Sequence, residues 1–146
     1  MATIGLDCQL ILDGTGYFIE PDSYHMVRSR VRASTANVLA ANPVTHFGVG
    51  ERYVDQGPGK RVWSFAVLAW QAIDTYAGQR VVTTGQQYRG ALHASYEKVA
   101  TPLTFTDPNG LSWSVHFDHL EEIIDDVRAQ TDTALQYTMS VELVEA

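Results

Sequence analysis

The sequence predicts a mainly β (α+β) fold, a β-sandwich or partial barrel of about six to seven strands with one packed α-helix. Three observations predict it. Apolar and polar residues alternate with a period of two in several segments, two strong turn sequences join pairs of these segments, and one segment has a helical period. The 146 residues are enough for a core, and we expect a single domain over residues 1–146.

The first strands are expected in residues 9–21, where two apolar runs flank Asp13-Gly14-Thr15-Gly16. A glycine-containing turn between apolar runs is typical of a β-hairpin. Residues 25–33 then alternate, HMVRSRVRA, which predicts a strand with arginines on one face. Those arginines are Arg28, Arg30 and Arg32, and the opposite face carries Val27, Ser29, Val31 and Ala33.

Residues 57–60, GPGK, raise the question of a phosphate-binding loop. Such a loop requires a glycine where this chain has Val54 and a hydroxyl where it has Arg61, so both flanks of the motif fail. The alternative is a turn, because proline presets its own φ and glycine accepts positive φ. We therefore predict that this turn reverses the chain into a buried strand over residues 61–69.

Residues 83–102 change to a helical period, with Thr84 as the expected cap and Pro102 as the stop. The apolar face of this helix is expected to hold Tyr88, Ala91, Leu92, Tyr96 and Val99.

A second hairpin is predicted over residues 103–117, with Asp107-Pro108-Asn109-Gly110 as its turn. Residues 119–130, HLEEIIDDVRAQ, fit either a helix or a bulged edge strand. The last segment, LQYTMSVELVEA, alternates and predicts a closing strand.

No pattern of residues indicates catalysis, a cofactor or a metal site. The best metal candidates are His116, Asp118 and His119, but on a regular strand His119 points away from the other two. The single cysteine, Cys8, excludes an internal disulfide. The chain start lacks a basic region before its apolar run, and no run is long enough to span a membrane, so we expect neither a signal peptide nor membrane insertion.

Charge suggests where subunits or partners meet. The net charge of −7 opposes general binding to nucleic acid, so the arginine face is expected to pair with acidic residues of this chain or of a neighbouring subunit. The tryptophans are expected to be core or interface anchors. The candidate interface residues are Arg28, Arg30, Arg32, Trp63, Trp70, Glu142 and Glu145.

The order of these elements resembles the distal-tail (baseplate hub) proteins of long-tailed bacteriophages and their tail-tube relatives. In that family a helix leads to a P-L-x-F-x-D-x-x-G hairpin, a V-x-F strand and a terminal Y-x-x-x-V-E-L-V-E strand. The resemblance covers the C-terminal third well and the first hundred residues only in outline. The residues that carry it are Pro102, Leu103, Phe105, Asp107, Gly110, Val115, Phe117, Tyr137, Val141, Glu142, Leu143 and Glu145.

The resemblance implies a non-enzymatic virion protein, made in the host cytoplasm, that forms a homohexameric ring around the DNA channel at the tail tip or along the tube. Its partners would be itself and other tail proteins, with DNA passing through without specific binding. Distal-tail proteins usually carry a second, carbohydrate-binding-like domain, for which 146 residues leave no room. The candidate lumen or ring-contact residues are Asp118, Glu121, Glu122, Asp125 and Asp126.

Two other functions remain open at this point. One is a small β-rich ligand-binding module with tyrosine and tryptophan side chains lining a groove. The other is a metal-dependent hydrolase that uses the two histidines and the aspartate named above.

Overall fold

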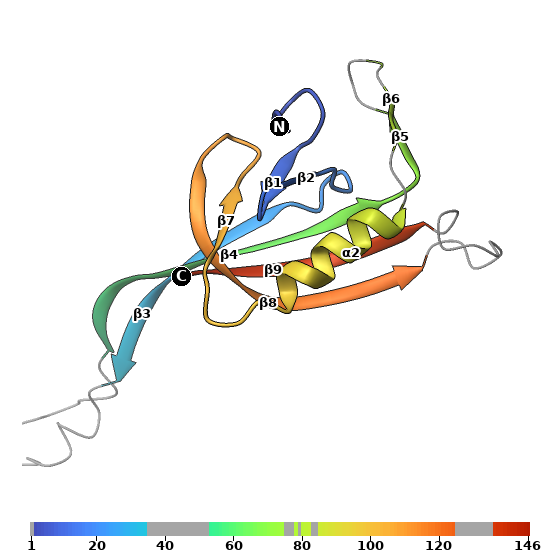
Figure 1. The fold of residues 1–146 in the computed structure, drawn as a ribbon. Coiled ribbons are helices and arrows are strands. Elements are labelled where there is room, and N and C mark those ends of the chain that lie inside the picture. The colour runs from blue at the N-terminus through green and yellow to red at the C-terminus, as the bar shows by residue number, and fades with distance from the viewer. Residues whose placement is uncertain (1, 35–52, 75–77, 79, 83–84, 125–135) are drawn as a thin grey trace, which may run out of the picture. The chain divides into compact units, whose positions relative to one another are not determined.

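The fold is mainly β with one packed α-helix in the described residues, as the sequence predicts (Figure 1). The structure is a computed structural model, and it describes residues 2–34, 53–74, 78, 80–82, 85–124 and 136–146. The chain divides into two compact units, residues 1–26 with 62–146 and residues 27–61. The elements are β1 (Leu10–Leu12), β2 (Thr15–Tyr17), β3 (His25–Ser34), β4 (Tyr53–Ala69), β5 (Ala72–Asp74), β6 (Arg80–Val82), α2 (Gly85–Tyr96), β7 (Leu103–Thr106), β8 (Ser112–Ile124) and β9 (Tyr137–Glu145).

Seven of the described strands form one hydrogen-bonded sheet in the order β2-β1-β7-β8-β9-β4-β3, and β5 pairs separately with β6. The segment after β2 returns to β4, because Ile19 bridges Val67 and the Leu68 N–H donates to the Phe18 carbonyl at 2.8 Å. Strand β2, at one end of this order, therefore continues into a segment that borders β4. The sheet of the larger unit curls into a partial barrel, one of the two predicted architectures.

Both predicted hairpins are confirmed. In the first, Leu12 pairs with Thr15 across a two-residue turn in which Asp13 and Gly14 have φ values of 52° and 83°. Positive φ at both positions is the geometry of a type I′ hairpin turn, which glycine favours and aspartate tolerates.

The second hairpin joins β7 to β8, and its turn is held by the side chain of Asp107. This carboxylate accepts the N–H groups of Asn109 and Leu111, both at 2.9 Å, and the indole N–H of Trp113 at 3.1 Å. Asp107 is only 4% exposed, and the three donors offset the cost of burying its charge. The motif therefore links a local turn to an aromatic side chain of the core rim.

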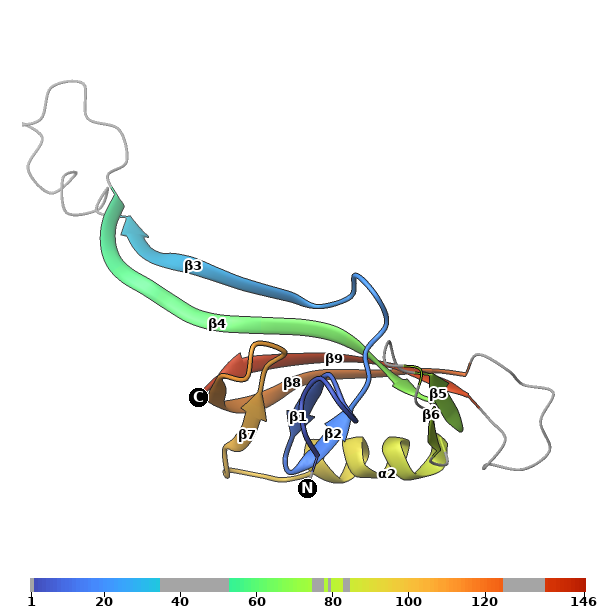
Figure 2. The same cartoon turned by 90° about the horizontal axis from the view of Figure 1, so that it is seen from above.

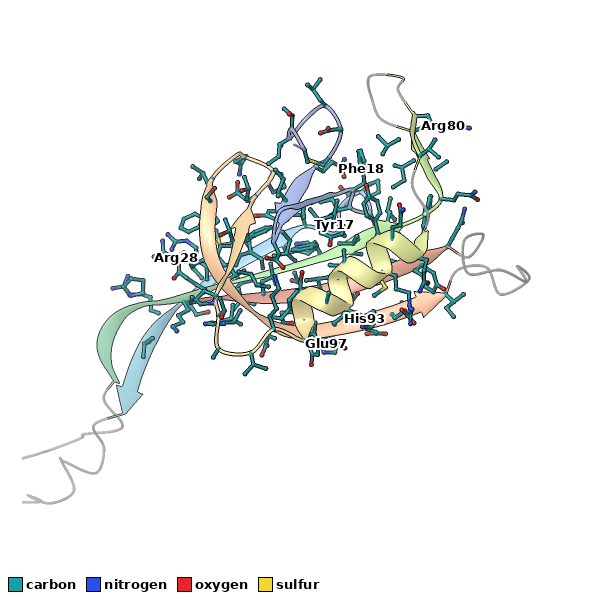
Figure 3. The ribbon with its side chains drawn as sticks, viewed as in Figure 1. Tyr17, Phe18, Arg28, Arg80, His93 and Glu97 are labelled. Atoms are coloured by element: carbon teal, nitrogen blue, oxygen red, sulfur yellow. The ribbon has the colours of Figure 1, made fainter. Side chains whose placement is uncertain are left out.

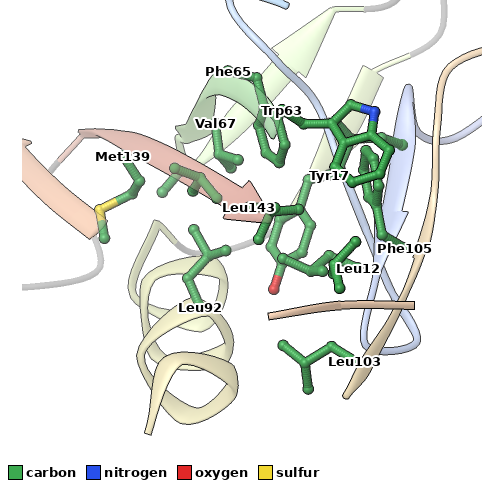
Figure 4. Packing of buried hydrophobic residues seen from close by; sticks show 14 of the residues in the cluster. Leu12, Tyr17, Trp63, Phe65, Val67, Leu92, Leu103, Phe105, Met139 and Leu143 are labelled. Carbon is green, nitrogen blue, oxygen red and sulfur yellow. The ribbon is translucent and has the colours of Figure 1, made fainter. Parts of the chain in front are cut away.

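The core lies inside the partial barrel and takes one face of each long strand (Figure 4). Trp63 and Phe65 of β4 meet Phe105 of β7, with ring centroids 5.4 and 5.8 Å apart. From β9, the core receives alternate residues, as the sequence pattern predicts. They are Tyr137, Met139, Val141 and Leu143.

Helix α2 packs beside β8 and β9 on the core side of the sheet (Figure 2). Leu92 is its fully buried apolar anchor. The predicted helix exists, but its predicted apolar face is too long. The helix ends at Tyr96, so Val99 lies beyond it and is 85% exposed. Tyr96 is 47% exposed and contacts Phe117 at its edge, whereas Ser95 is buried in its place.

Residues 27–61 form a separate unit in which the parts of β3 and β4 that it contains are neighbouring strands. Here the predicted reversal at GPGK is wrong, because these residues continue inside β4, which begins at Tyr53. Gly57 has a φ of +96°, while Gly59 lies so close to β3 that a Cβ would stand 2.8 Å from the carbonyl oxygen of Ser29. The glycines thus allow a kink and a close approach of strands within one ribbon.

Strand β8 contains a β-bulge, which settles the choice left open for the acidic segment up to Ile124. Phe117 pairs with Leu143 and His119 with Glu142, so Asp118 is the extra residue. The segment is therefore a bulged strand as far as Ile124, and residues 125–130 lie outside the described part of the chain.

Candidate functional site

The predicted arginine face is on β3, in the smaller unit. Arg28 and Arg30 are exposed, and nothing is described of the Arg32 side chain. Arg28 and Lys60 make no ion pair within the described residues, whereas Arg30 does have an interaction partner. The smaller unit thus presents cations that no carboxylate of the described chain neutralises.

The two tryptophans predicted at an interface have different surroundings. Trp63 is 1% exposed and packs against Phe105 and Trp113 inside the barrel, so it is a core residue and the interface prediction for it is wrong for this protomer. Its position follows from β4, which turns Trp63 toward the same face as Phe65. Trp70 is half-buried beside a small apolar cluster of Phe18, Leu68 and Ile73.

Strand alternation divides the predicted acidic run between the two faces of the sheet. Glu122 pairs across the sheet with buried Met139, whereas Glu121 pairs with Ser140 on the opposite, outer face. Asp118 is exposed at the bulge, and Asp125 and Asp126 lie outside the described residues. The described carboxylates of this run do not share one face.

Glu122 forms an ion-pair cluster with α2 that the sequence analysis did not predict. Its carboxylate accepts a hydrogen bond from Arg89 and lies 3.3 Å from His93 Nε2, and Figure 3 labels His93 on the helix. Burial raises the pKa of Glu122, but the hydrogen bonds and charges of Arg89 and His93 outweigh burial, so the pKa is lowered. Spacing along α2, with Arg89 and His93 four residues apart, was the signal that both would reach one acidic partner.

A groove of about 270 Å³ lies on the outer face of β4, β8 and β9. Its titratable residues are Glu142 of β9 with His119 and Glu121 of β8, and His119 Nε2 lies 3.8 Å from the Glu121 carboxylate. Glu142 pairs in register with both His119 and Ser64, which places it centrally among the three strands. The remaining lining residues are Ser23, Ser64, Phe65, Ala66, Ser140 and Val141.

Of the two predicted terminal carboxylates, only Glu142 lines this groove. It is half-buried and has no ion-pair partner in the described part of the chain. Glu145 pairs in register with Val115 and has an interaction of its own. Of the two candidate interface carboxylates, Glu142 is therefore the one that lies in a groove.

A larger, mostly apolar groove of about 590 Å³ lies elsewhere on the larger unit. Phe18, Ile19, Tyr24, Leu68 and Ile73 line it, together with residues of the N-terminal segment. Tyr24 is the only tyrosine in this lining, and the three tryptophans are not part of it.

Cys8 also borders the larger groove but is 1% exposed. Burial is the main cause that raises the pKa of its thiol to about 11, and the neighbouring charge of Asp7 and a hydrogen bond with it act in the same direction. A thiol in this state is a poor nucleophile at neutral pH.

The metal candidates are arranged differently from the regular strand that the sequence predicted. Because of the bulge, His116 pairs with Val144 and His119 with Glu142, two β9 residues on the same outer face. The two histidines therefore share a face, contrary to the prediction that His119 points away from His116. In the described residues, no group of three or more metal-ligating side chains is close enough to hold an ion.

Charge is unevenly distributed between the two units. Residues 27–61 contain six of the ten arginines and lysines but only two of the 17 acidic residues, which gives this unit a formal charge of +4. The other unit holds four cations and 15 carboxylates, a formal charge of −11. The net charge of the whole chain conceals a basic unit and an acidic unit.

Comparison of the chain with protein families and with curated proteins finds no match to either. Among the described residues, no helix has the length and apolar character needed to cross a membrane.

Proposed function

We propose that this protein is a structural component of a bacteriophage tail that forms a homohexameric ring around the DNA channel, at the tail tip or along the tube. The observation that carries the proposal is the resemblance in the succession α2–β7–β8–β9. Six apolar residues of that pattern are core residues here: Leu103, Phe105, Val115, Tyr137, Val141 and Leu143 are all buried. The resemblance therefore concerns residues that build the fold rather than a variable surface.

The charges are compatible with this role. Six copies with a net charge of −7 each carry a formal charge of −42, and negative charge around a channel opposes adhesion of DNA phosphates. A basic unit and an acidic unit in one chain also favour head-to-tail association of identical copies, which produces a ring when the rotation between copies closes. In this role the protein needs no cofactor and catalyses no reaction.

Light scattering of the protein as it elutes from a size-exclusion column, together with negative-stain microscopy, tests the proposal. Six chains of 16.2 kDa give about 97 kDa, and the particles should be rings with an open centre. A monomer at every concentration tested, with no ring on any grid, would contradict the proposal.

The apolar groove favours a second candidate function, binding of a small apolar ligand. Its volume of about 590 Å³ falls in the usual range of roughly 300–1,000 Å³ for small-molecule sites. An environment-sensitive apolar fluorophore should then bind one site per chain, and Phe18→Asp should abolish binding while Val82→Asp, at a position outside the groove, leaves it unchanged. Binding that is equal in both variants would argue against the groove as a ligand site.

A further inference from the structure

We propose that the outer-face groove around Glu142 is the docking site for the Arg28 side chain of a second copy of this chain. The inference rests on the proposed ring and names the two surfaces that join neighbouring copies. It commits to a head-to-tail contact in which the basic unit of one copy meets the acidic unit of the next.

The groove has the chemistry to receive a guanidinium group. Glu142 and Glu121 place two carboxylates on the outer face of adjacent strands: Glu142 is directly opposite His119 in the strand register, and Glu121 is two residues further along β8. A planar guanidinium donates several N–H groups in fixed directions and suits paired carboxylates better than an ammonium does. The volume of about 270 Å³ equals roughly nine water molecules, which leaves room for the guanidinium and its last methylene groups.

The described chain does not neutralise Glu142. Arg89, Arg80 and Lys98 are engaged with Glu122, Asp74 and Asp13 respectively. Glu142 is half-buried on a strand between two others. A half-buried carboxylate without a cation gains most from a charged partner supplied by another molecule.

Arg28 fits the requirements for that partner. It is exposed, has no ion pair within the described residues, and belongs to the unit with a formal charge of +4. The exposed side chains of Val27 and Val31 lie on the opposite face of this strand, so they are not part of the proposed contact.

Charge reversal in separate copies tests the contact directly. Arg28→Glu alone or Glu142→Arg alone puts like charges together at every contact, and each should weaken self-association at about 50 mM salt by tenfold or more. When the two variants are mixed in equal amounts, copies can alternate around an even-numbered ring. Every contact then joins opposite charges, and assembly should recover.

Glu97→Arg is the matched control for the mixture. Glu97 is an exposed carboxylate just beyond the end of α2, so its substitution changes the net charge by the same amount away from the groove (Figure 3). Glu97→Arg should assemble like the wild type and should not rescue Arg28→Glu. Circular dichroism of each variant establishes that loss of assembly is not loss of folding.

Sedimentation velocity of these samples distinguishes the outcomes. Single variants that assemble like the wild type would refute this contact while leaving the ring intact, whereas a monomeric wild type would refute the ring itself. If a chain carrying both Arg28→Glu and Glu142→Arg recovered assembly while the mixture of single variants did not, the two residues would pair within one copy, and the proposal would be overturned. Binding of a short DNA duplex that Arg28→Glu abolishes, with assembly unchanged, would assign the arginine to phosphate instead.

Discussion

Replacing Asp107 with alanine should destabilise the protein more than any other substitution at a turn position of the second hairpin. The alanine variant removes the acceptor of three hydrogen bonds, from the Asn109 and Leu111 N–H groups and from the indole of Trp113. Asn109 and Leu111 are exposed, so water can partly replace the acceptor for their N–H groups. Trp113 is half-buried and its indole N–H is more costly to leave unpaired.

The magnitude follows from these three donors. An unpaired, partly buried N–H costs about 1–3 kcal/mol, and each bond to a solvent-accessible backbone group contributes about 0.5–1 kcal/mol. The sum is about 2–5 kcal/mol. In a chain of this size each kcal/mol lowers the melting temperature by roughly 2–4 °C, so Asp107→Ala should melt roughly 4–20 °C lower.

Asp107→Asn separates the contributions. Asparagine keeps one oxygen for the two backbone N–H groups but directs an NH₂ group at the indole N–H, so only the Trp113 bond is lost. Its cost should be about half that of alanine. Urea unfolding followed by circular dichroism, at one fixed protein concentration, measures both variants.

If Asp107→Ala stayed within about 0.5 kcal/mol of the wild type, the carboxylate would not stabilise the hairpin as argued. Equal losses in the alanine and asparagine variants would mean that the two backbone bonds contribute nothing.

Three further predictions follow from the local geometry. Gly59→Val should disrupt the β3–β4 ribbon at a cost of about 1–3 kcal/mol, because the valine side chain would meet the Ser29 carbonyl. Lys60→Ala should change stability by less than about 0.5 kcal/mol. Hydrogen exchange of the ribbon amides measures both effects, and a larger effect of Lys60→Ala would contradict this account. Cys8 should resist thiol reagents at pH 8 and react only on unfolding, since it is buried and its pKa is raised to about 11; rapid labelling of the native protein would show that the site opens. Because the pKa of Glu122 is lowered, its ion-pair cluster stabilises the fold at pH values above the ordinary carboxylate pKa of about 4.3, and this stabilisation is lost as pH falls through the lower folded-state pKa. The stability difference between wild type and Glu122→Gln should therefore shrink in acid. A difference that does not depend on pH would contradict the assignment.

Local sequence was sufficient wherever a structure depends on neighbouring residues. The first hairpin follows from Asp13 and Gly14, because glycine has no Cβ to oppose positive φ and aspartate tolerates it. The second follows from Asp107, whose side chain can accept N–H groups two and four residues ahead. The alternation of residues 137–145 predicted which face of β9 is buried, since side chains in a strand have a strict period of two.

The same local reasoning was wrong at the glycines of β4. Glycine and proline at residues 57–59 are typical of a turn, but here a neighbouring strand occupies the space that a side chain at Gly59 would need. Only the pairing of β3 with β4 decides between a turn and a close approach of strands, and that pairing joins residues far apart in the chain.

By itself, the sequence determined the strand-rich fold, both hairpin turns, the single described helix and the clustering of arginines, because each depends on local dihedral preferences and periodicity. The tertiary structure decided which charges face each other. The bulge at Asp118 shifts the register of β8, so that His119 and Glu121 join Glu142 on the outer face while Glu122 turns toward α2. A one-residue shift transfers every following side chain of a strand to the opposite face, and the energy that selects this register comes from contacts with β9 and α2 that no local pattern contains.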